Sequence, residues 1–259
     1  MTQEKRILVC EDSLEGIFSA VYDGWKECLG GVEVSVQTSF PTNMELFTTY
    51  REIDTDRSKT GKVMRTILVK LGSEAYEQIC LAAAGADPDR GTAIYYVLHR
   101  ALGHGRCETN VMEALADPYV NKVAKLALRV KREYHHYFGF IRFREISGMF
   151  LLAQIQPEND ILPLLAPHFS NRFPNENWVI YDEGRQKALC HGKGTECVIK
   201  KEVRLQIPRN AMGDRGEYEE LWRAFCDSVS IEARNNEKLQ KQMLPLRFRN
   251  NMPEFSMKG

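Results

Sequence analysis

Basic side chains recur at steps of three and four along residues 118–137, a spacing that can present them to the phosphates of a nucleic acid. They are Lys122, Lys125, Arg129, Arg132 and His136. At about 100° per residue these positions fall within roughly 80° of one another on a helix, opposite an apolar face. Guanidinium groups pair with phosphate oxygens through two parallel hydrogen bonds. The pattern therefore predicts one helix with a cationic face.

The next segment adds two arginines. Residues 138–146 alternate as a β-strand does, and this alternation predicts Phe138, Phe140, Arg142 and Arg144 on one face of that strand. Aromatic rings stack on unpaired bases, so a basic helix that leads into such a strand can follow a single strand or a distorted duplex. The expected nucleic-acid-binding residues are Lys125, Arg129, Arg132, Phe140, Arg142 and Arg144.

A simpler alternative explains the same residues. Solvated helix faces are commonly rich in lysine and arginine, and composition alone favours this interpretation. The two arginines would then bind carboxylates within the protein, such as Asp160 or Asp182.

Acid–base chemistry is a second possibility, with His135 and Asp160 as the candidate catalytic residues. Histidine titrates near neutrality, and Glu133, His136 and His168 extend this group. The alternative is structural, because histidines near the end of a helix interact favourably with its negative dipole end.

Four carboxylates lie near predicted strand ends, where a metal-assisted phosphodiester site can form, although capping and loop roles are more common. They are Asp12, Glu15, Asp54 and Asp56. The seven cysteines are scattered, and no Cys-x-x-Cys occurs. The phosphate-binding, dinucleotide-binding, zinc-protease and serine-hydrolase signatures are also absent from the sequence. We therefore expect no metal and no cofactor.

The elements that position these residues follow from hydrophobic period and turn signals. Strands are predicted at 6–10, 32–37, 138–146, 149–156, 178–182, 187–190 and 197–199. Helices are predicted at 14–29, 58–71, 73–84, 92–102, 117–138, 161–173 and 218–230, and in part of 235–252. Asp117 and Asp160 are the expected caps of two of these helices.

This order predicts an α+β fold rather than alternating βαβ units. Residues 1–137 form a helix-rich region with short strands. Residues 138–259 hold a small, mostly antiparallel sheet between strands 138–146 and 197–199, followed by C-terminal helices. The two regions can also be parts of one composite domain.

The 259 residues carry 35 basic and 35 acidic side chains, but these are unevenly distributed. Residues 1–117 hold 12 basic and 18 acidic groups, a net of −6, and residues 118–149 hold 7 and 2, a net of +5. Because charges act over about 10 Å, a neutral total permits a local contact with a polyanion. An apolar content of 43% excludes a disordered chain, and no apolar run is long enough for a membrane span. With no signal peptide recognised, we expect a cytoplasmic protein that makes no membrane contact.

An ordered series of motifs resembles the bacterial family named "probable DNA metabolism protein", a domain of unknown function. The series consists of residues 133–135 (EYH), 139–143 (GFIRF), 156–169 (QPENDILPLLAPHF), 172–173 (RF) and 178–182 (WVIYD). Similar positions occur at 12–16, 90–95, 221–223, 233–235, 243–245 and 253–255. The family often has Tyr-Trp in place of Arg247-Phe248 and Phe in place of His168, whereas His135 matches its motif.

This resemblance implies a role in DNA metabolism. Members of the family are typically encoded beside a radical S-adenosylmethionine (radical-SAM) protein assigned to DNA modification or repair. Other members are fused to a uracil-DNA glycosylase-like domain. We expect the stand-alone form here, and because the chain lacks a Cys-x-x-x-Cys-x-x-Cys triad, any radical chemistry would belong to the partner.

Three functions remain open at this point. The first is a DNA-binding accessory or specificity subunit that recognises single-stranded or damaged DNA beside the radical-SAM partner. The second is an enzyme that acts on nucleic acid or a nucleotide through His135 and carboxylates such as Asp160. The third is a protein-interaction module that binds the partner and never touches DNA. The resemblance favours the first.

Overall fold

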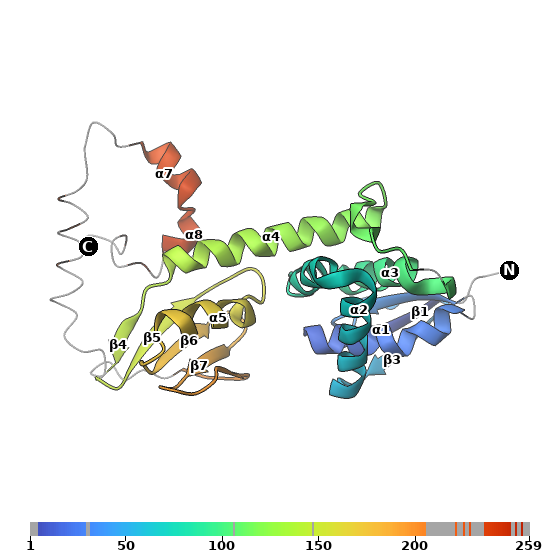
Figure 1. The fold of residues 1–259 in the computed structure, drawn as a ribbon, viewed down its shortest axis with the longest axis horizontal. Helices are drawn as coiled ribbons and strands as arrows, with labels where there is room; N and C mark the ends of the chain where they lie inside the picture. The colour runs from blue at the N-terminus through green and yellow to red at the C-terminus, as the bar shows by residue number, and fades with distance from the viewer. Residues whose placement is uncertain are drawn as a thin grey trace. The chain divides into compact units, whose positions relative to one another are not determined.

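The computed structural model of the chain describes residues 5–29, 32–105, 107–146, 148–205 and 236–249, and positions 221, 225, 228, 252 and 255. The chain divides into two compact units, Met1–Arg132 and Glu133–Gly259, and both are drawn in Figure 1. Together they contain helices and two small sheets, which is an α+β fold.

The first unit is built on a parallel sheet with strand order β2-β1-β3. Its strands are β1 (Lys5–Cys10), β2 (Glu33–Gln37) and β3 (Thr48–Ile53). Its helices are α1 (Leu14–Leu29), α2 (Arg57–Ala83), α3 (Arg90–Leu102), η1 (Gly103–Gly105) and η2 (Val111–Glu113), and α4 (Pro118–Phe140) begins here. The central strand β1 is the most buried, because it is paired with β2 on one side and β3 on the other.

The predicted elements of this unit are largely confirmed. The two helices expected at 58–71 and 73–84 form the single element α2, which is kinked at Gly72. Gly72 has φ +88°, a left-handed conformation that favours glycine. Within this α+β fold, β1, α1 and β2 form a single βαβ unit, because β1 and β2 pair in parallel. Strand β3 was not predicted, since its residues are mostly exposed and lack an apolar alternation.

The second unit holds a sheet with strand order β4-β5-β6-β7-β8. Its strands are β4 (Arg144–Ile146), β5 (Phe150–Ile155), β6 (Trp178–Asp182), β7 (Lys187–His191) and β8 (Val198–Lys200). Its helices are the end of α4, then α5 (Leu162–Arg172), α7 (Glu237–Met243) and α8 (Leu246–Arg249). Only β5 and β6 pair in parallel, so the expected mostly antiparallel sheet is confirmed.

Two predictions for this unit are wrong. Helix α4 continues to Phe140, and the N–H of Ile141 still donates to the carbonyl oxygen of Tyr137, so strand β4 begins only at Arg144. Asp160 does not cap α5, because its carboxylate binds Lys187 instead. Most of the helix predicted at 218–230 lies outside the described residues, whereas α7 and α8 confirm the partly helical tail. No described helix is long and apolar enough to cross a membrane.

The burial of Cys10 at the end of β1 gives a prediction about thiol reactivity. Desolvation raises the pKa of the Cys10 thiol to about 12, although nearby Arg90 opposes this shift. At pH 8 only roughly one such thiol in ten thousand is ionised, and the thiolate is the reactive form. We expect iodoacetamide to alkylate exposed Cys107 in the native protein and to modify Cys10 only after unfolding. Peptide mass mapping measures both; equal rates in the native protein would contradict the prediction.

Candidate nucleic-acid interface

Helix α4 carries the predicted cationic face, and its start is fixed by the residues expected to fix it. The carboxylate of Asp117 accepts hydrogen bonds from the backbone N–H groups of Tyr119 (2.8 Å) and Val120 (3.2 Å). Pro118 occupies the first helical position, where a missing N–H costs nothing. The apolar side of the helix is buried, with Val120, Val123 and Val130 fully covered. The opposite side is therefore presented to solvent.

The cationic face contains three exposed side chains, Lys125, Arg129 and Arg132. None of the three forms an ion pair with a residue in the described part of the chain. All three belong to the first unit. On an ideal helix they lie within about 60° of one another and span about 10 Å along the axis. These three residues are called the α4 cation set below.

The two ends of the predicted stripe are occupied by contacts within the protein. Lys122 is half-buried, and its Nζ lies 2.9 Å from an oxygen of Asp87 and 3.0 Å from one of Asp89. Burial by itself would raise the pKa of Asp87, but Lys122, the N–H of Asp89 and the charge of Arg129 together lower it. His136 is also half-buried, and its ring contacts Phe140 and Phe248.

The remaining predicted interface residues lie in the second unit. The prediction that they share one face of a strand is wrong. Phe140 belongs to α4, and its ring already packs against Phe248 at 5.2 Å between centroids. Arg142 lies between α4 and β4, and its Nη1 donates to the carbonyl oxygens of Gly139 (2.7 Å) and Ile141 (3.2 Å). Arg144 is the first residue of β4. The three residues thus occupy different elements.

The carboxylates suggested as partners of the two arginines have other partners. Asp160 forms an ion pair with Lys187. Asp182 is completely buried and accepts hydrogen bonds from the N–H (3.1 Å) and Nη1 (3.3 Å) of Arg185. Desolvation raises the pKa of Asp182, and the hydrogen bonds and charge of Arg185 oppose this effect. Each carboxylate is therefore held by a cation of β7 or of the turn that precedes it.

The candidate acid–base pair is not brought into contact. His135 is exposed on α4, and its ring lies 5.9 Å from that of Phe138. His168 stacks on the same Phe138 ring with 4.1 Å between ring centroids, and burial together with the charge of Arg172 lowers the pKa of His168. A catalytic role for His135 and Asp160 stays a prediction.

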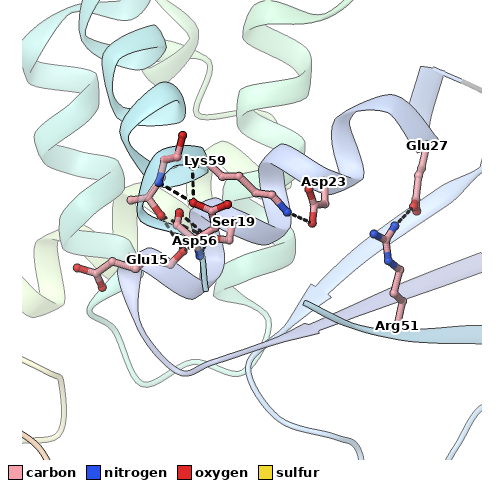
Figure 2. A network of polar contacts seen from close by, with 9 residues as sticks. Glu15, Ser19, Asp23, Glu27, Arg51, Asp56 and Lys59 are labelled. Atoms are coloured by element: carbon pink, nitrogen blue, oxygen red, sulfur yellow. Dashed lines mark hydrogen bonds and ion pairs between the residues drawn. The ribbon is translucent and has the colours of Figure 1, made fainter. Parts of the chain in front are cut away.

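The four carboxylates near strand ends do not form one cluster. Figure 2 shows two of them where α1 meets the start of α2. The Asp56 side chain caps α2 by accepting from the N–H groups of Ser58 (2.7 Å) and Lys59 (3.3 Å). Glu15 contributes its backbone oxygen, which accepts from Ser19 Oγ at 2.8 Å. Within the described residues no three acidic, histidine or cysteine side chains form a group that can hold a metal ion.

The same view shows two ion pairs that tie α1 to its neighbours (Figure 2). Lys59 Nζ lies 2.7 Å from an Asp23 oxygen, and Arg51 Nη1 lies 2.8 Å from an oxygen of Glu27. Lys59 and Arg51 thus have acidic partners, unlike the α4 cation set.

One buried polar cluster was not anticipated. Glu133 is 3% exposed and lies on the buried side of α4, in line with Val130 and Tyr137. Its carboxylate accepts from the N–H of Glu158 (2.9 Å), the N–H of Asn159 (2.9 Å) and the Asn159 Nδ2 (2.6 Å). The available signal was its spacing, because a charged residue at an apolar position of a helix must have partners.

Arg247 completes this cluster from α8. Its Nη1 lies 3.7 Å from an oxygen of Glu133 and pairs with Glu158. The neighbouring Phe248 is buried against Tyr137. The Arg247-Phe248 dipeptide, where the chain departs from the motif it resembles, therefore fastens α8 to α4 and to the 156–160 loop.

A second buried cation was also missed, in the first unit. Arg90 is 4% exposed and donates to the carbonyl oxygens of Ala83 (3.0 Å) and Asp87 (2.9 Å). It also donates to Thr38 Oγ1 (3.4 Å) and forms an ion pair with Asp12. The two upstream segments that resembled family positions, 12–16 and 90–95, are thus joined by one side chain.

These elements define an α+β protein whose long helix α4 presents a set of exposed cations. The chain belongs to the family described as a domain of unknown function, DUF4130, whose model matches residues 88–254. The match includes Arg90, all of α4 and Arg247. No curated protein matches the chain.

Proposed function

We propose that this protein binds nucleic acid through the α4 cation set and acts as an accessory or specificity subunit in DNA repair or modification. The observation that supports the proposal is the contrast among the cations of α4. Lys122 and Lys131 are paired with carboxylates, whereas Lys125, Arg129 and Arg132 have no such partner among the described residues.

Unpaired cations on one face of a helix favour a polyanion for an electrostatic reason. Each phosphate that a lysine or arginine neutralises releases condensed counterions, and this release drives binding. The first 117 residues carry a net charge of −6, so a polyanion is attracted only where cations are gathered. Local, directed binding is therefore favoured over uniform coating of DNA.

The partner in this proposal is the radical-SAM protein implied by the resemblance at 133–182. Co-purification of the two proteins tests that part separately. A complex that forms while the chain retains no DNA would favour the interaction-module alternative.

The salt dependence of binding tests the nucleic-acid contact. With three phosphates neutralised on a single strand, the log–log slope of affinity against salt should be about −2, or roughly 20-fold weaker binding from 50 to 200 mM salt. Fluorescence anisotropy of a labelled single-stranded oligonucleotide measures this slope. The combined change Lys125→Gln, Arg129→Gln and Arg132→Gln should reduce the slope by about 2.

A matched control removes three cations that are already ion-paired in the same unit. The control variant combines Arg51→Gln, Lys59→Gln and Lys131→Gln. Because net charge changes equally in both variants, only a contact at the α4 cation set predicts a difference between them. Equal loss of affinity in the two variants, or binding that ignores salt, contradicts the proposal.

A further inference from the structure

The first unit contains a pocket of about 510 Å³ that the proposed phosphate contacts do not use. It lies among α1, α2, α3 and η1, and its wall is mostly apolar, with Val21, Ile67 and Leu98 among the lining residues. Pockets of this size accommodate small organic groups.

One wall of the pocket is aromatic. Tyr22 and Trp25 are three residues apart on α1, so both point to the same side of that helix. The Trp25 ring packs against His99 of α3 with 5.5 Å between centroids, which holds it in place while it borders the pocket. Tyr22 remains 39% exposed. Fixed aromatic faces of this kind are stacking platforms for planar rings.

Helix α2 contributes two lysines to the lining of the pocket. Lys62 and Lys70 are eight residues apart on α2, with Thr66 between them, and all three line the pocket. Residues at this spacing share one helix face, about 12 Å apart along the axis. Lys62 Nζ lies 5.3 Å from the centroid of the Tyr22 ring. Among the described residues neither lysine is paired with a carboxylate, and the lining set includes none.

We infer that this pocket receives one unstacked base of a nucleic-acid strand, with the phosphates on either side of that nucleotide held by Lys62 and Lys70. The inference rests on the proposed function, because it assigns a base-binding role to the unit that carries the α4 cation set. The aromatic residues match the planar base. Two separated cations fit a ligand that carries two phosphates better than a ligand that carries a single anionic group. A free mononucleotide has the same chemistry and is the other source of such a ligand.

Strands that contain the fluorescent base 2-aminopurine test the inference. Stacking on Trp25 should quench 2-aminopurine fluorescence when the strand binds. Trp25→Leu should abolish the quenching and weaken strand binding by about 5- to 150-fold, the range measured for loss of one stacked base. Trp25→Phe, which keeps an aromatic ring, should retain most of both effects.

A second variant tests the inference even if Trp25→Leu does not fold. Lys62→Gln with Lys70→Gln changes only exposed side chains, so the fold should persist by circular dichroism. Because each phosphate neutralised on a single strand contributes about 0.7 to the salt slope, two phosphates held at the pocket should add about 1.4 to the slope that the α4 cation set produces, and this variant should remove that added part.

The outcomes separate this inference from the proposed function. One outcome is salt-dependent strand binding with no quenching of 2-aminopurine and no effect of Trp25→Leu or of Lys62→Gln with Lys70→Gln. This outcome overturns the base-binding role of the pocket and leaves the proposed function standing. Binding of a mononucleotide that depends on Trp25, with no binding of strands, supports a nucleotide pocket and contradicts the proposed function. If octanoate displaces the 2-aminopurine strand from the protein but a mononucleotide does not, the pocket binds aliphatic acids, and the inference is overturned.

Discussion

Glu133→Gln is expected to lower the free energy of unfolding of the second unit by about 3 kcal/mol, because it removes a buried carboxylate that accepts three hydrogen bonds. Glutamine keeps the shape of the side chain but turns an NH2 group toward N–H donors. It also removes the negative charge opposite Arg247, whose Nη1 lies 3.7 Å away. Two effects therefore act together, an unsatisfied buried donor and a cation left without one of its partners.

Hydrogen exchange locates this loss within the molecule. The amide protons of Glu158 and Asn159 are bonded directly to Glu133, so their exchange should accelerate more than that of the strands around Trp178. A urea titration followed by circular dichroism gives the overall change. Glu145→Gln, at an exposed position of β4, is the matched control and should change stability by less than about 0.5 kcal/mol. A cost below about 1 kcal/mol for Glu133→Gln contradicts the assigned role.

Arg90→Lys is expected to destabilise the first unit by a similar amount, about 3 kcal/mol, although the charge is kept. The guanidinium distributes its donors among the carbonyl oxygens of Ala83 and Asp87, the hydroxyl of Thr38 and the carboxylate of Asp12. A lysine ammonium has no planar fork and cannot reach all four groups. The carbonyl contacts should account for most of the cost, because Asp12 is largely exposed and its ion pair is weakened by solvent.

A matched substitution separates this effect from a general one. Arg65→Lys changes an exposed arginine of α2 in the same unit and should be nearly neutral. Thermal unfolding of both variants, with hydrogen exchange of residues 83–90, provides the measurement. Net charge is unchanged, so the salt slope of nucleic-acid binding should be that of the unmodified protein. Equal stability of the two variants would show that the buried fork is dispensable.

Local sequence patterns predicted the elements that bury an apolar face. Helix α4 and its Asp117 cap, the strands β1 and β6, and the break of α2 at Gly72 all follow from period and turn residues. Strand β3 was missed because it depends on pairing with β1 rather than on its own apolar residues. The formation of β3 is thus determined by its pairing with a distant segment, which the local periodicity of its sequence does not reveal.

The candidate site shows the same contrast between features that follow from local sequence and features that depend on distant partners. The exposure of Lys125, Arg129 and Arg132 follows from helical period alone. The roles of Glu133 and Arg90 do not, because each depends on partners far away in the chain. Alternating residues at 138–146 suggested a strand, but Phe138 and Phe140 remain in α4, where their rings contact His168 and Phe248. Tertiary packing outweighed local propensity there.

The sheet of the first unit has a consequence for the rate at which that unit folds. Its central strand β1 precedes both of its partners in the chain, and both pairings are parallel. Each therefore forms only after an intervening loop has been closed, which costs entropy before any strand contact repays it. The hairpin of β6 and β7 in the second unit needs only a short turn. The β1 pairings should therefore be the slow step, with the apolar strand β1 exposed to association with other chains until β2 and β3 are in place.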